Sequence, residues 1–279
     1  MWLFGDGATD NQINTNHVYT AGSYTPTLIA VSSVACADTI SQTITVNPKP
    51  TAAFAAPAVC VGAASTFTAG ATVSTGNITN YYWAFGDGST DLTQNPSHTY
   101  ALADTFYATL AVQTDQGCLD TLSQAVVVHP APVAAFTAGA VCLNQTNTFA
   151  DASTVTSGSI SQWAWDFGDA QGSNSQNASH TYAAQGNYTI NLVVATTYGC
   201  TDSTNQSITV FDKPVAAFTA SEECQGVATQ FTDASSIGNG SLNQWTYYFA
   251  DGNSSNQQNT SHLYLNAGTY AAYLVATST

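Results

Sequence analysis

A motif that returns at a fixed spacing constrains this chain more than any other feature. Residues 83–88 read Trp-Ala-Phe-Gly-Asp-Gly, and His-Thr-Tyr follows at 98–100. The same order of residues begins at Trp2, at Trp165 and, with tyrosine in place of tryptophan, at Tyr247, so the copies are offset by 81, 82 and 82 residues. A fixed period of this length indicates one folding unit copied along the chain. Any functional interpretation therefore has to hold for several copies.

The period predicts two complete units flanked by two partial ones. Their predicted bounds are 1–48 for a C-terminal half, 49–130 and 131–212 for complete units, and 213–279 for a unit without its last strand. A unit of this size buries a modest core, so cross-links or neighbouring units would help to stabilise it. Incomplete units at both ends are most simply explained if this sequence is a segment of a longer protein. The less favoured alternative is that subunits complete one another by strand exchange.

Apolar residues alternate along short segments, which predicts strands. Tyr81, Trp83 and Phe85 fall on one face of a strand because side chains repeat every two residues, and Trp165 and Phe167 do the same in the next copy. We expect these aromatic residues to form the core. About seven short strands per unit, regular turn signals and no helical period predict an all-β fold of tandem immunoglobulin-like antiparallel sandwiches arranged head to tail.

Charge excludes two classes of function. The chain has two lysines, no arginine and 17 acidic residues, for a formal net charge of −15. Binding to nucleic acid or to anionic lipid requires clustered basic residues, so neither is expected. No apolar run approaches the roughly 18 residues of a membrane span, so we expect no membrane insertion in this segment.

Both lysines lie at junctions between units. Lys49-Pro50 and Lys213-Pro214 occupy equivalent positions, and proline gives a short, stiff link that stops the preceding strand. We expect the lysines to pair with acids on the adjoining unit.

The charged and polar residues of the motif resemble a catalytic set at first sight. Ser97, His98 and Asp87 could be drawn as a hydrolase triad, but the set recurs only loosely and lacks a nucleophile-elbow sequence. We expect instead that His98 and Tyr100 brace the turn, that the protein is not an enzyme and that it needs no cofactor. Asp87 with Asp91 is a weak candidate for Ca²⁺. The predicted core and turn residues are Trp83, Phe85, Asp87, His98, Tyr100, Trp165, Phe167, Asp169, His180 and Tyr182.

The order of these features resembles the polycystic kidney disease (PKD) domain. The resemblance is carried by Pro50 to Phe54, Trp83 to Gly88, Ser97 to Tyr100 and Phe106 to Val112, and it covers the whole chain. It implies an immunoglobulin-like sandwich used outside the cell as a spacer, adhesion or substrate-contact module. The cysteine-containing style, with Gly-Cys-Leu-Asp-Thr at 117–121, is similar to tandem units in large secreted surface proteins of Bacteroidota.

A second motif follows from that resemblance. Asp-Thr at 38–39, Asp-Thr at 120–121 and Asp-Ser at 202–203 resemble the acceptor signal for O-glycosylation in secreted Bacteroidota proteins. The candidate acceptors are Thr39, Thr121 and Ser203. An equally good reading is that a hydroxyl side chain suits an exposed strand.

Six cysteines occupy two repeat positions, which predicts disulfides in an extracellular chain. The first position holds Cys36, Cys118 and Cys200, and the second holds Cys60, Cys142 and Cys224. Pairing within units gives Cys60–Cys118 and Cys142–Cys200. Pairing across junctions gives Cys36–Cys60, Cys118–Cys142 and Cys200–Cys224. A last strand of about ten residues at roughly 3.3 Å each would separate Cys118 from the next unit, which favours the first set, and both sets stay open on the sequence.

The sequence thus predicts a non-enzymatic extracellular structural protein, a rod of repeats that forms a stalk, a surface fibre or a secreted filament. Its expected partners are neighbouring units or subunits of the fibre. The alternatives are an adhesin or module that binds extracellular polysaccharide or another cell surface, and the spacer of a larger secreted hydrolase.

Overall fold

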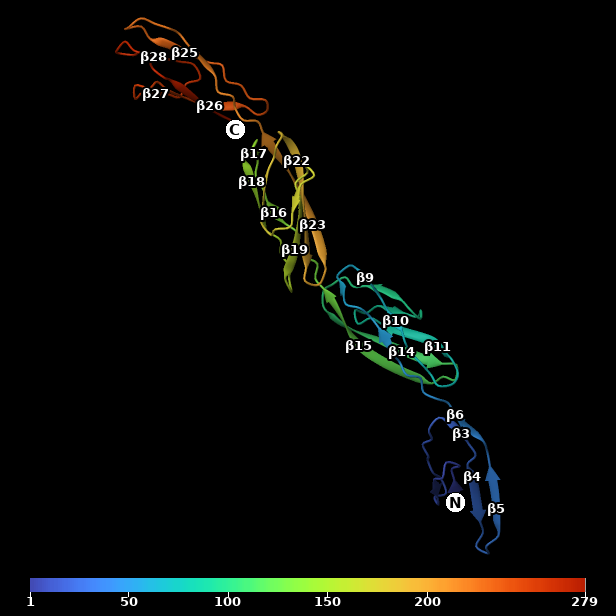
Figure 1. The fold of residues 1–279 in the computed structure, drawn as a ribbon. Helices are drawn as coiled ribbons and strands as arrows, with labels where there is room; N and C mark the ends of the chain where they lie inside the picture. The colour runs from blue at the N-terminus through green and yellow to red at the C-terminus, as the bar shows by residue number, and fades with distance from the viewer. Residues whose placement is uncertain (279) are drawn as a thin grey trace. The chain divides into compact units, whose positions relative to one another are not determined.

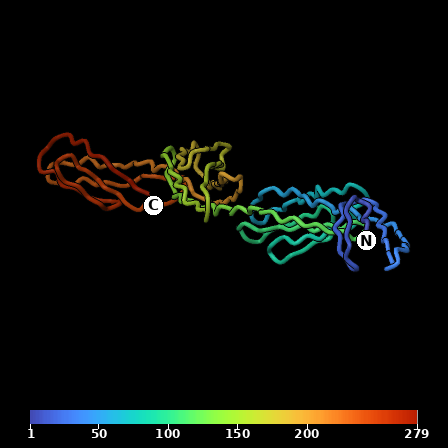
Figure 2. Tube along the Cα trace, turned by 90° about the horizontal axis from the view of Figure 1, so that it is seen from below, coloured from blue at the N-terminus to red at the C-terminus, as the bar shows by residue number. Residues whose placement is uncertain are grey.

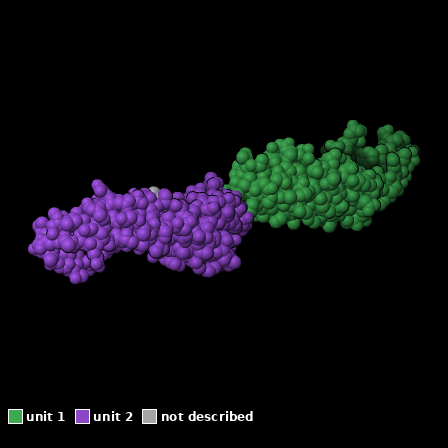
Figure 3. All heavy atoms as spheres, turned by 90° about the horizontal axis from the view of Figure 1, so that it is seen from above, with its two compact units in different colours: residues 1–131 green, residues 132–279 purple. Residues whose placement is uncertain are grey.

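The computed structural model describes residues 1–278, and these contain strands, turns and irregular segments but no helix (Figure 1). The chain divides into two compact units, Met1–Ala131 and Pro132–Thr279 (Figure 3). Each unit holds two of the repeats seen in the sequence. The predicted all-β class of tandem immunoglobulin-like sandwiches is confirmed.

The first repeat contains six strands: β1 (Trp2–Leu3), β2 (Thr9–Asp10), β3 (Gly22–Tyr24), β4 (Thr27–Val31), β5 (Ala37–Ser41) and β6 (Ile44–Val46). They form a four-stranded sheet in the order β2-β1-β4-β5 and a two-stranded sheet of β3 and β6. Phe4 is the one large apolar side chain here that is buried.

The second repeat is a complete sandwich, and its trace runs back and forth several times (Figure 2). Its strands are β7 (Phe54–Ala55), β8 (Val59–Cys60), β9 (Ala64–Thr66), β10 (Thr68–Ala69), β11 (Ile78–Ala84), β12 (Thr90–Asp91), β13 (Ser97–Thr99), β14 (Thr105–Thr114) and β15 (Leu119–His129). One sheet has the order β12-β11-β14-β15-β8, and the pairs β10-β7 and β13-β9 face it. The pairing of β15 with β8 is parallel, whereas the other pairings of this repeat are antiparallel.

The third repeat reproduces this arrangement. Its strands are β16 (Phe136–Thr137), β17 (Val141–Cys142), β18 (Thr146–Asp151), β19 (Ile160–Asp166), β20 (Gly172–Ser173), β21 (Ala178–Thr181), β22 (Gly186–Thr196) and β23 (Thr201–Phe211). A five-stranded sheet, β17-β23-β22-β19-β20, packs on the three-stranded sheet β16-β18-β21. Here too the last strand, β23, pairs in parallel with a short strand, β17.

The fourth repeat has β24 (Phe218–Ala220), β25 (Thr229–Asp233), β26 (Leu242–Tyr248), β27 (Ser254–Ser255), β28 (Thr260–His262) and β29 (Tyr273–Ser278). Its two sheets are three-stranded, in the orders β24-β25-β28 and β27-β26-β29. Residues 213–278 contain no equivalent of β15 or β23.

Alternation along the long strands builds the cores of the complete repeats. In β14 the side chains of Ala108, Leu110 and Val112 are fully buried, and they belong to the same core cluster as Trp83 of β11 and Phe85, which directly follows that strand. The third repeat buries Ile190, Leu192 and Val194 in the same way. Burying an aliphatic side chain contributes about 1.5–3 kcal/mol, so these rows supply much of the stability of a small domain.

The cysteines correct both predicted sets of disulfides. Cys60 and Cys200 are disulfide-bonded, whereas Cys118 and Cys142 carry free thiols. The pairs Cys60–Cys118 and Cys142–Cys200 are wrong because Cys60 in β8 is aligned with His129, the last residue of β15, whereas Cys118 precedes its first residue. The junction set is also wrong, since each of its pairs contains a free thiol: Cys36, Cys118, Cys142 or Cys224.

Lys49 also differs from expectation. Its Nζ lies 2.6 Å from Oδ1 of Asp120, which belongs to the repeat that Lys49 opens and not to the adjoining one. The Lys49 side chain is 70% exposed. Lys213 is exposed.

Candidate functional site

The repeated motif forms a tight turn at the end of β11. Gly86 and Gly88 have φ angles of 87° and 96°, a region that favours glycine, and Asp87 lies between them. A Cβ atom on Gly86 would lie 2.8 Å from the carbonyl oxygen of Tyr107 in β14. The glycine therefore lets the turn approach the neighbouring strand.

A cluster of four side chains surrounds this turn. Nε2 of His98 lies 2.7 Å from Oδ2 of Asp87, and the imidazole stacks on Phe85 with ring centroids 4.2 Å apart. Tyr100 meets the edge of the same imidazole, and its hydroxyl donates a hydrogen bond of 3.0 Å to the Phe85 carbonyl. The cluster thus ties β13 and the turn together.

The same cluster occurs in every repeat. The histidine–aspartate distances are 2.6 Å for His17–Asp6, 2.7 Å for His98–Asp87, 2.7 Å for His180–Asp169 and 2.6 Å for His262–Asp251. The tyrosine hydroxyl reaches a phenylalanine carbonyl in each copy, at 3.0 or 3.1 Å: Tyr19–Phe4, Tyr100–Phe85, Tyr182–Phe167 and Tyr264–Phe249. We name these four sets the turn clusters.

The turn cluster changes the ionisation of its members. Burial by itself raises the pKa of Asp87, but hydrogen bonds from Ser89 and from His98 outweigh it and lower the pKa to about 2. Burial, with a smaller effect of the Asp87 charge, raises the pKa of Tyr100 to about 12. Burial and then the Asp169 charge raise the pKa of Tyr182 in the same way.

The geometry does not support acyl-transfer chemistry. A relay places the serine and the aspartate on opposite nitrogens of the imidazole. Here Ser89 Oγ, at 3.3 Å, and Asp87 both contact Nε2 of His98. The equivalents of Ser89 are Ala8, Gln171 and Asn253, and in each of them the backbone N–H donates to the aspartate. Ser97 lies in β13, paired with Thr66.

The two aspartates considered for Ca²⁺ already have donors. Asp87 accepts hydrogen bonds from Ser89 and His98, and Oδ1 of Asp91 accepts from the amide and the hydroxyl of Thr93, both at 2.6 Å. Residues 1–278 contain no group of three or more His, Cys, Asp or Glu side chains arranged to hold a metal ion.

The aspartates of the candidate glycosylation motif have a structural role that the sequence did not reveal. Oδ2 of Asp120 accepts the amide hydrogen of Ala52 at 2.8 Å, and Asp202 binds the amide of Ala134 at the same distance. Each aspartate therefore ties the start of the closing strand to the opening segment of its own repeat. The repeated spacing of 68 residues between aspartate and amide was a signal that could have shown it.

The candidate acceptors Thr39, Thr121 and Ser203 are exposed. Glycosylation of these residues stays a prediction.

An exposed aromatic pair lies on the fourth repeat and was not predicted. Tyr248 of β26 and Tyr273 of β29 stack with ring centroids 4.7 Å apart, and both are more than a third exposed. Tyr82 and Tyr107 of the second repeat are also exposed, by 42% and 67%.

The fold and the turn clusters together indicate the class of protein. Each complete repeat is an immunoglobulin-like sandwich whose recurring polar residues are bound within the fold, as in a non-catalytic structural or binding module. Residues 1–278 contain no helix with the length and hydropathy of a membrane span.

Comparison with known proteins gives the family. The family model described as PKD domain matches residues 45–129, 127–211 and 212–279, so the chain belongs to the PKD domain family. It is similar to the PKD1 domain of Vibrio anguillarum Epp, with 32% identity, a TM-score of 0.27 and coverage of 29% of this chain and 93% of that one. It is also similar to the PKD1 domain of the Vibrio cholerae metalloprotease PrtV, with 31% identity, a TM-score of 0.28 and coverage of 30% and 99%.

Proposed function

We propose that the chain is a non-enzymatic structural protein of the cell exterior, in which PKD repeats are linked head to tail as a stalk or fibre. The observation that supports this most directly is the turn cluster. Its polar groups are the same in all four repeats and are bound to one another, so the part of the chain that recurs is devoted to holding each repeat together.

The strand order of the complete repeats suits a module that resists pulling. The amide of Val61, next to β8, donates to the carbonyl of His129 at 2.8 Å, and β8 runs parallel to β15. Leu143 donates to Phe211 in the third repeat. When the two ends of a repeat are pulled apart, the bonds between parallel strands are sheared together and not opened one after another.

Force–extension measurements on single chains held by their ends, under reducing conditions, test this role. We expect one discrete event for each complete repeat, with a gain of roughly 250 Å, because about 80 residues extend by about 3.3–3.6 Å each, less the folded length. Val61→Pro removes the amide donor and should lower the unfolding force of the second repeat, whereas Val61→Ala retains the donor and is the matched control. Unfolding without discrete events would contradict the proposal.

A binding role is the second candidate, and the exposed tyrosines favour it. Tyrosine rings on an outer sheet face can stack on sugars of an extracellular polysaccharide or contact another cell surface. The double substitution Tyr248→Ala/Tyr273→Ala should then abolish binding on a glycan array, while Ile13→Ala, at an exposed loop of the first repeat, should not. An array without signal for the unchanged protein argues against an adhesin.

A third candidate is the spacer of a secreted hydrolase. Its support is the 31% identity to a PKD1 domain that belongs to a metalloprotease. A catalytic domain encoded in the same reading frame would favour this role, and its absence would remove it.

A further inference from the structure

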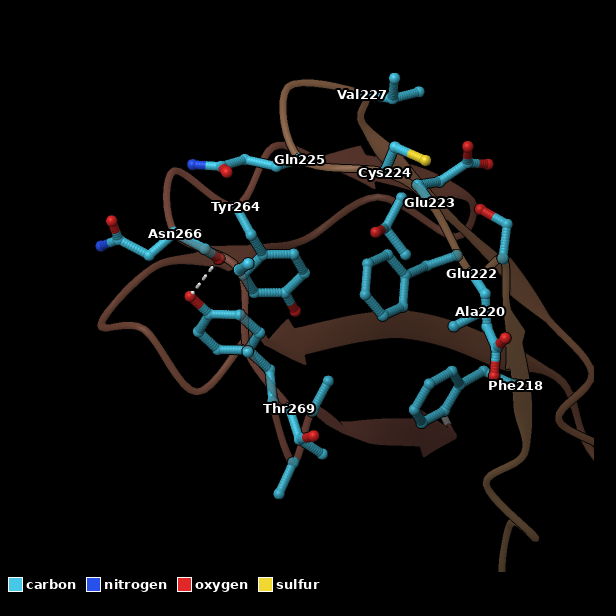
Figure 4. A pocket seen from close by; sticks show the side chains of 18 residues that line it. Phe218, Ala220, Glu222, Glu223, Cys224, Gln225, Val227, Tyr264, Asn266 and Thr269 are labelled. Atoms are coloured by element: carbon cyan, nitrogen blue, oxygen red, sulfur yellow. Dashed lines mark hydrogen bonds between the residues drawn. The ribbon is translucent and has the colours of Figure 1, made fainter.

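The hollow on the fourth repeat is lined in part by side chains whose equivalents form the core of a complete repeat (Figure 4). It has a volume of about 540 Å³, and Phe218 and Tyr264 border it. Their equivalents in the second repeat, Phe54 and Tyr100, belong to one core cluster with Val128 of the closing strand β15. A ligand site of the repeat fold therefore has to lie on a surface that stays open when the closing strand is present.

The third repeat, which has its closing strand β23, is hollowed on such a surface. The hollow has a volume of about 430 Å³ and lies on the outer face of the five-stranded sheet, over β19, β22 and the start of β23. Val193 and Ala195 line it and flank the buried Val194 in β22, so their side chains point away from the core. Ala164 pairs with Val193 and faces the same way. Small-molecule sites have volumes of about 300–1,000 Å³, so the hollow is large enough for a small ligand.

Alanine at position 164 forms part of the floor of the hollow. Ala164 pairs with Val193 as Tyr82 of the second repeat pairs with Ala111, so the positions of Ala164 and Tyr82 are equivalent. Tyr82 places a phenol ring on this face of the sheet and is 42% exposed. The third repeat has a methyl group in place of that ring, so the space of a six-membered ring is left open against an apolar floor.

A second difference between the two repeats leaves polar groups free at the rim. In the second repeat, Nδ2 of Asn80 donates a hydrogen bond of 2.9 Å to Oε1 of its cross-strand partner Gln113. The equivalent pair in the third repeat is Gln162 and Ala195, and the alanine side chain has no polar atom. Within residues 1–278, the side-chain amides of Gln162 and Asn174 make no hydrogen bond, and both residues are exposed. Each amide therefore offers two donors and an acceptor to a ligand.

The charge around the hollow selects a neutral ligand. None of the residues that line it carries a charge. Residues 131–212 contain five aspartates and no lysine or arginine, so the acidic surface repels an anion, and the anion meets no basic side chain there. A cation, in turn, meets no carboxylate in the lining.

We propose that the hollow of the third repeat binds a segment of a neutral polysaccharide. One sugar ring takes the place that the Tyr82 ring has in the second repeat, with a C–H face against Ala164 and Val193. Hydroxyl groups of the sugar bond to the amides of Gln162 and Asn174. An apolar floor with a few polar groups at its rim is the usual construction of a small-molecule site. The inference rests on the binding role, the second candidate function above, and gives it a site on a different repeat from the tyrosine pair.

Calorimetric titration with sugars of defined charge tests the ligand class. The probes are cellohexaose, mannohexaose and chitohexaose, which are neutral, and hexagalacturonic acid, which is anionic at neutral pH. We expect at least one neutral probe to bind at a single site per chain and the anionic probe not to bind. Binding of none of the neutral probes, or tighter binding of the anionic probe than of the neutral ones, overturns the proposal.

Two tyrosine substitutions locate the site. Ala164→Tyr introduces the side chain that the second repeat has at this position, so it should fill the hollow and abolish binding. Ser207→Tyr adds the same ring at an exposed position of β23 outside the hollow, so it should bind as the unchanged protein does. Circular dichroism checks that both variants are folded. Gln162→Ala should weaken binding roughly 2- to 10-fold, the range expected for one hydrogen bond. Equal affinities of Ala164→Tyr and Ser207→Tyr overturn the proposal.

The inference and the proposed functions fail separately. Loss of binding in Tyr248→Ala/Tyr273→Ala but not in Ala164→Tyr would place the polysaccharide on the fourth repeat, which overturns this site and retains the binding role. Force–extension does not depend on a ligand. A chain that shows discrete unfolding events and binds no neutral probe would retain the structural role and lose this site.

Discussion

Nε2 of His98 and Oδ2 of Asp87 lie 2.7 Å apart, and a histidine–aspartate pair with this geometry occurs in each of the four repeats. The pair joins a turn to a strand that begins ten residues later. It therefore links the ionisation of an aspartate to the closure of the sandwich.

Acid should weaken the second repeat through Asp87. Its pKa is about 2 in the folded protein and 3.8 ordinarily, so the ionised form is favoured by folding. The stabilisation is complete above pH 4 and is lost as the pH falls from about 4 to about 2. Thermal melts across this range should show a melting temperature that falls with the pH. Asp87→Asn removes this carboxyl group, so the melting temperature of the variant should depend less on pH over the same range. A melting temperature that rises on acidification in this window would contradict the assignment.

Tyr100→Phe should destabilise the second repeat by about 1–3 kcal/mol, because it leaves the buried Phe85 carbonyl without its donor. Tyr264→Phe is the matched control. Tyr264 makes the same bond to Phe249 at 3.1 Å but is half-buried, so water can replace the hydroxyl and the cost should be smaller. Denaturant titration of both variants measures the difference, and equal costs would show that burial does not set it.

Gly86→Ala should cost at least about 1–2 kcal/mol, since alanine at φ 87° is strained and its Cβ would meet the backbone of Tyr107. Gly88→Ala separates the two effects. Its φ is 96°, but no atom lies within 4 Å of the added Cβ, so only the backbone strain remains. Chemical denaturation should rank Gly86→Ala below Gly88→Ala in stability.

Asp120→Asn should lower the melting temperature more than Lys49→Ala does. The carboxylate holds the amide of Ala52, whereas the lysine is largely exposed and screened by solvent. The third repeat has Asp202 and the Ala134 amide but alanine at the position of Lys49, so Asp202→Asn should resemble Asp120→Asn. A larger effect of Lys49→Ala would show that the ion pair matters more than the amide.

Alkylation of the unfolded, unreduced protein should modify four thiols. The expected sites are Cys36, Cys118, Cys142 and Cys224, with Cys60 and Cys200 modified only after reduction. Peptide mass spectrometry identifies the sites. Modification of Cys60 without reduction would contradict the bonding described above.

The sequence predicts the architecture because each level of pattern is local. Alternation places Trp83 and Phe85 on one face, and both are 2% exposed. Glycine and aspartate mark the turn by their own conformational preferences. Four copies of each signal make the assignment of the fold secure.

The sequence did not predict which residues far apart in the chain contact one another. The prediction of the disulfides depended on which end of the sandwich holds Cys60. Its position follows from the parallel pairing of β8 with β15, and no local sequence pattern indicates that pairing. The bond from Asp120 to Ala52 spans 68 residues and was missed for the same reason, although the same spacing between Asp202 and Ala134 in the third repeat could have suggested it. The partner of Lys49 was expected in the neighbouring unit because a junction residue is adjacent in sequence to two units, and the sequence does not show which of them holds the acid.

The turns of the last two repeats show how far the copies are free to diverge. Ala170 stands where the second repeat has Gly88, in open space, and keeps a φ of 68°. Ala250 stands at the crowded position of Gly86, with a φ of 63°, but the residue that faces it, Ala271, precedes the start of β29. A side chain at the position of Gly88 meets no atom within 4 Å, whereas one at the position of Gly86 meets the backbone of Tyr107, so the second repeat tolerates substitution better at the outer glycine of its turn than at the inner one.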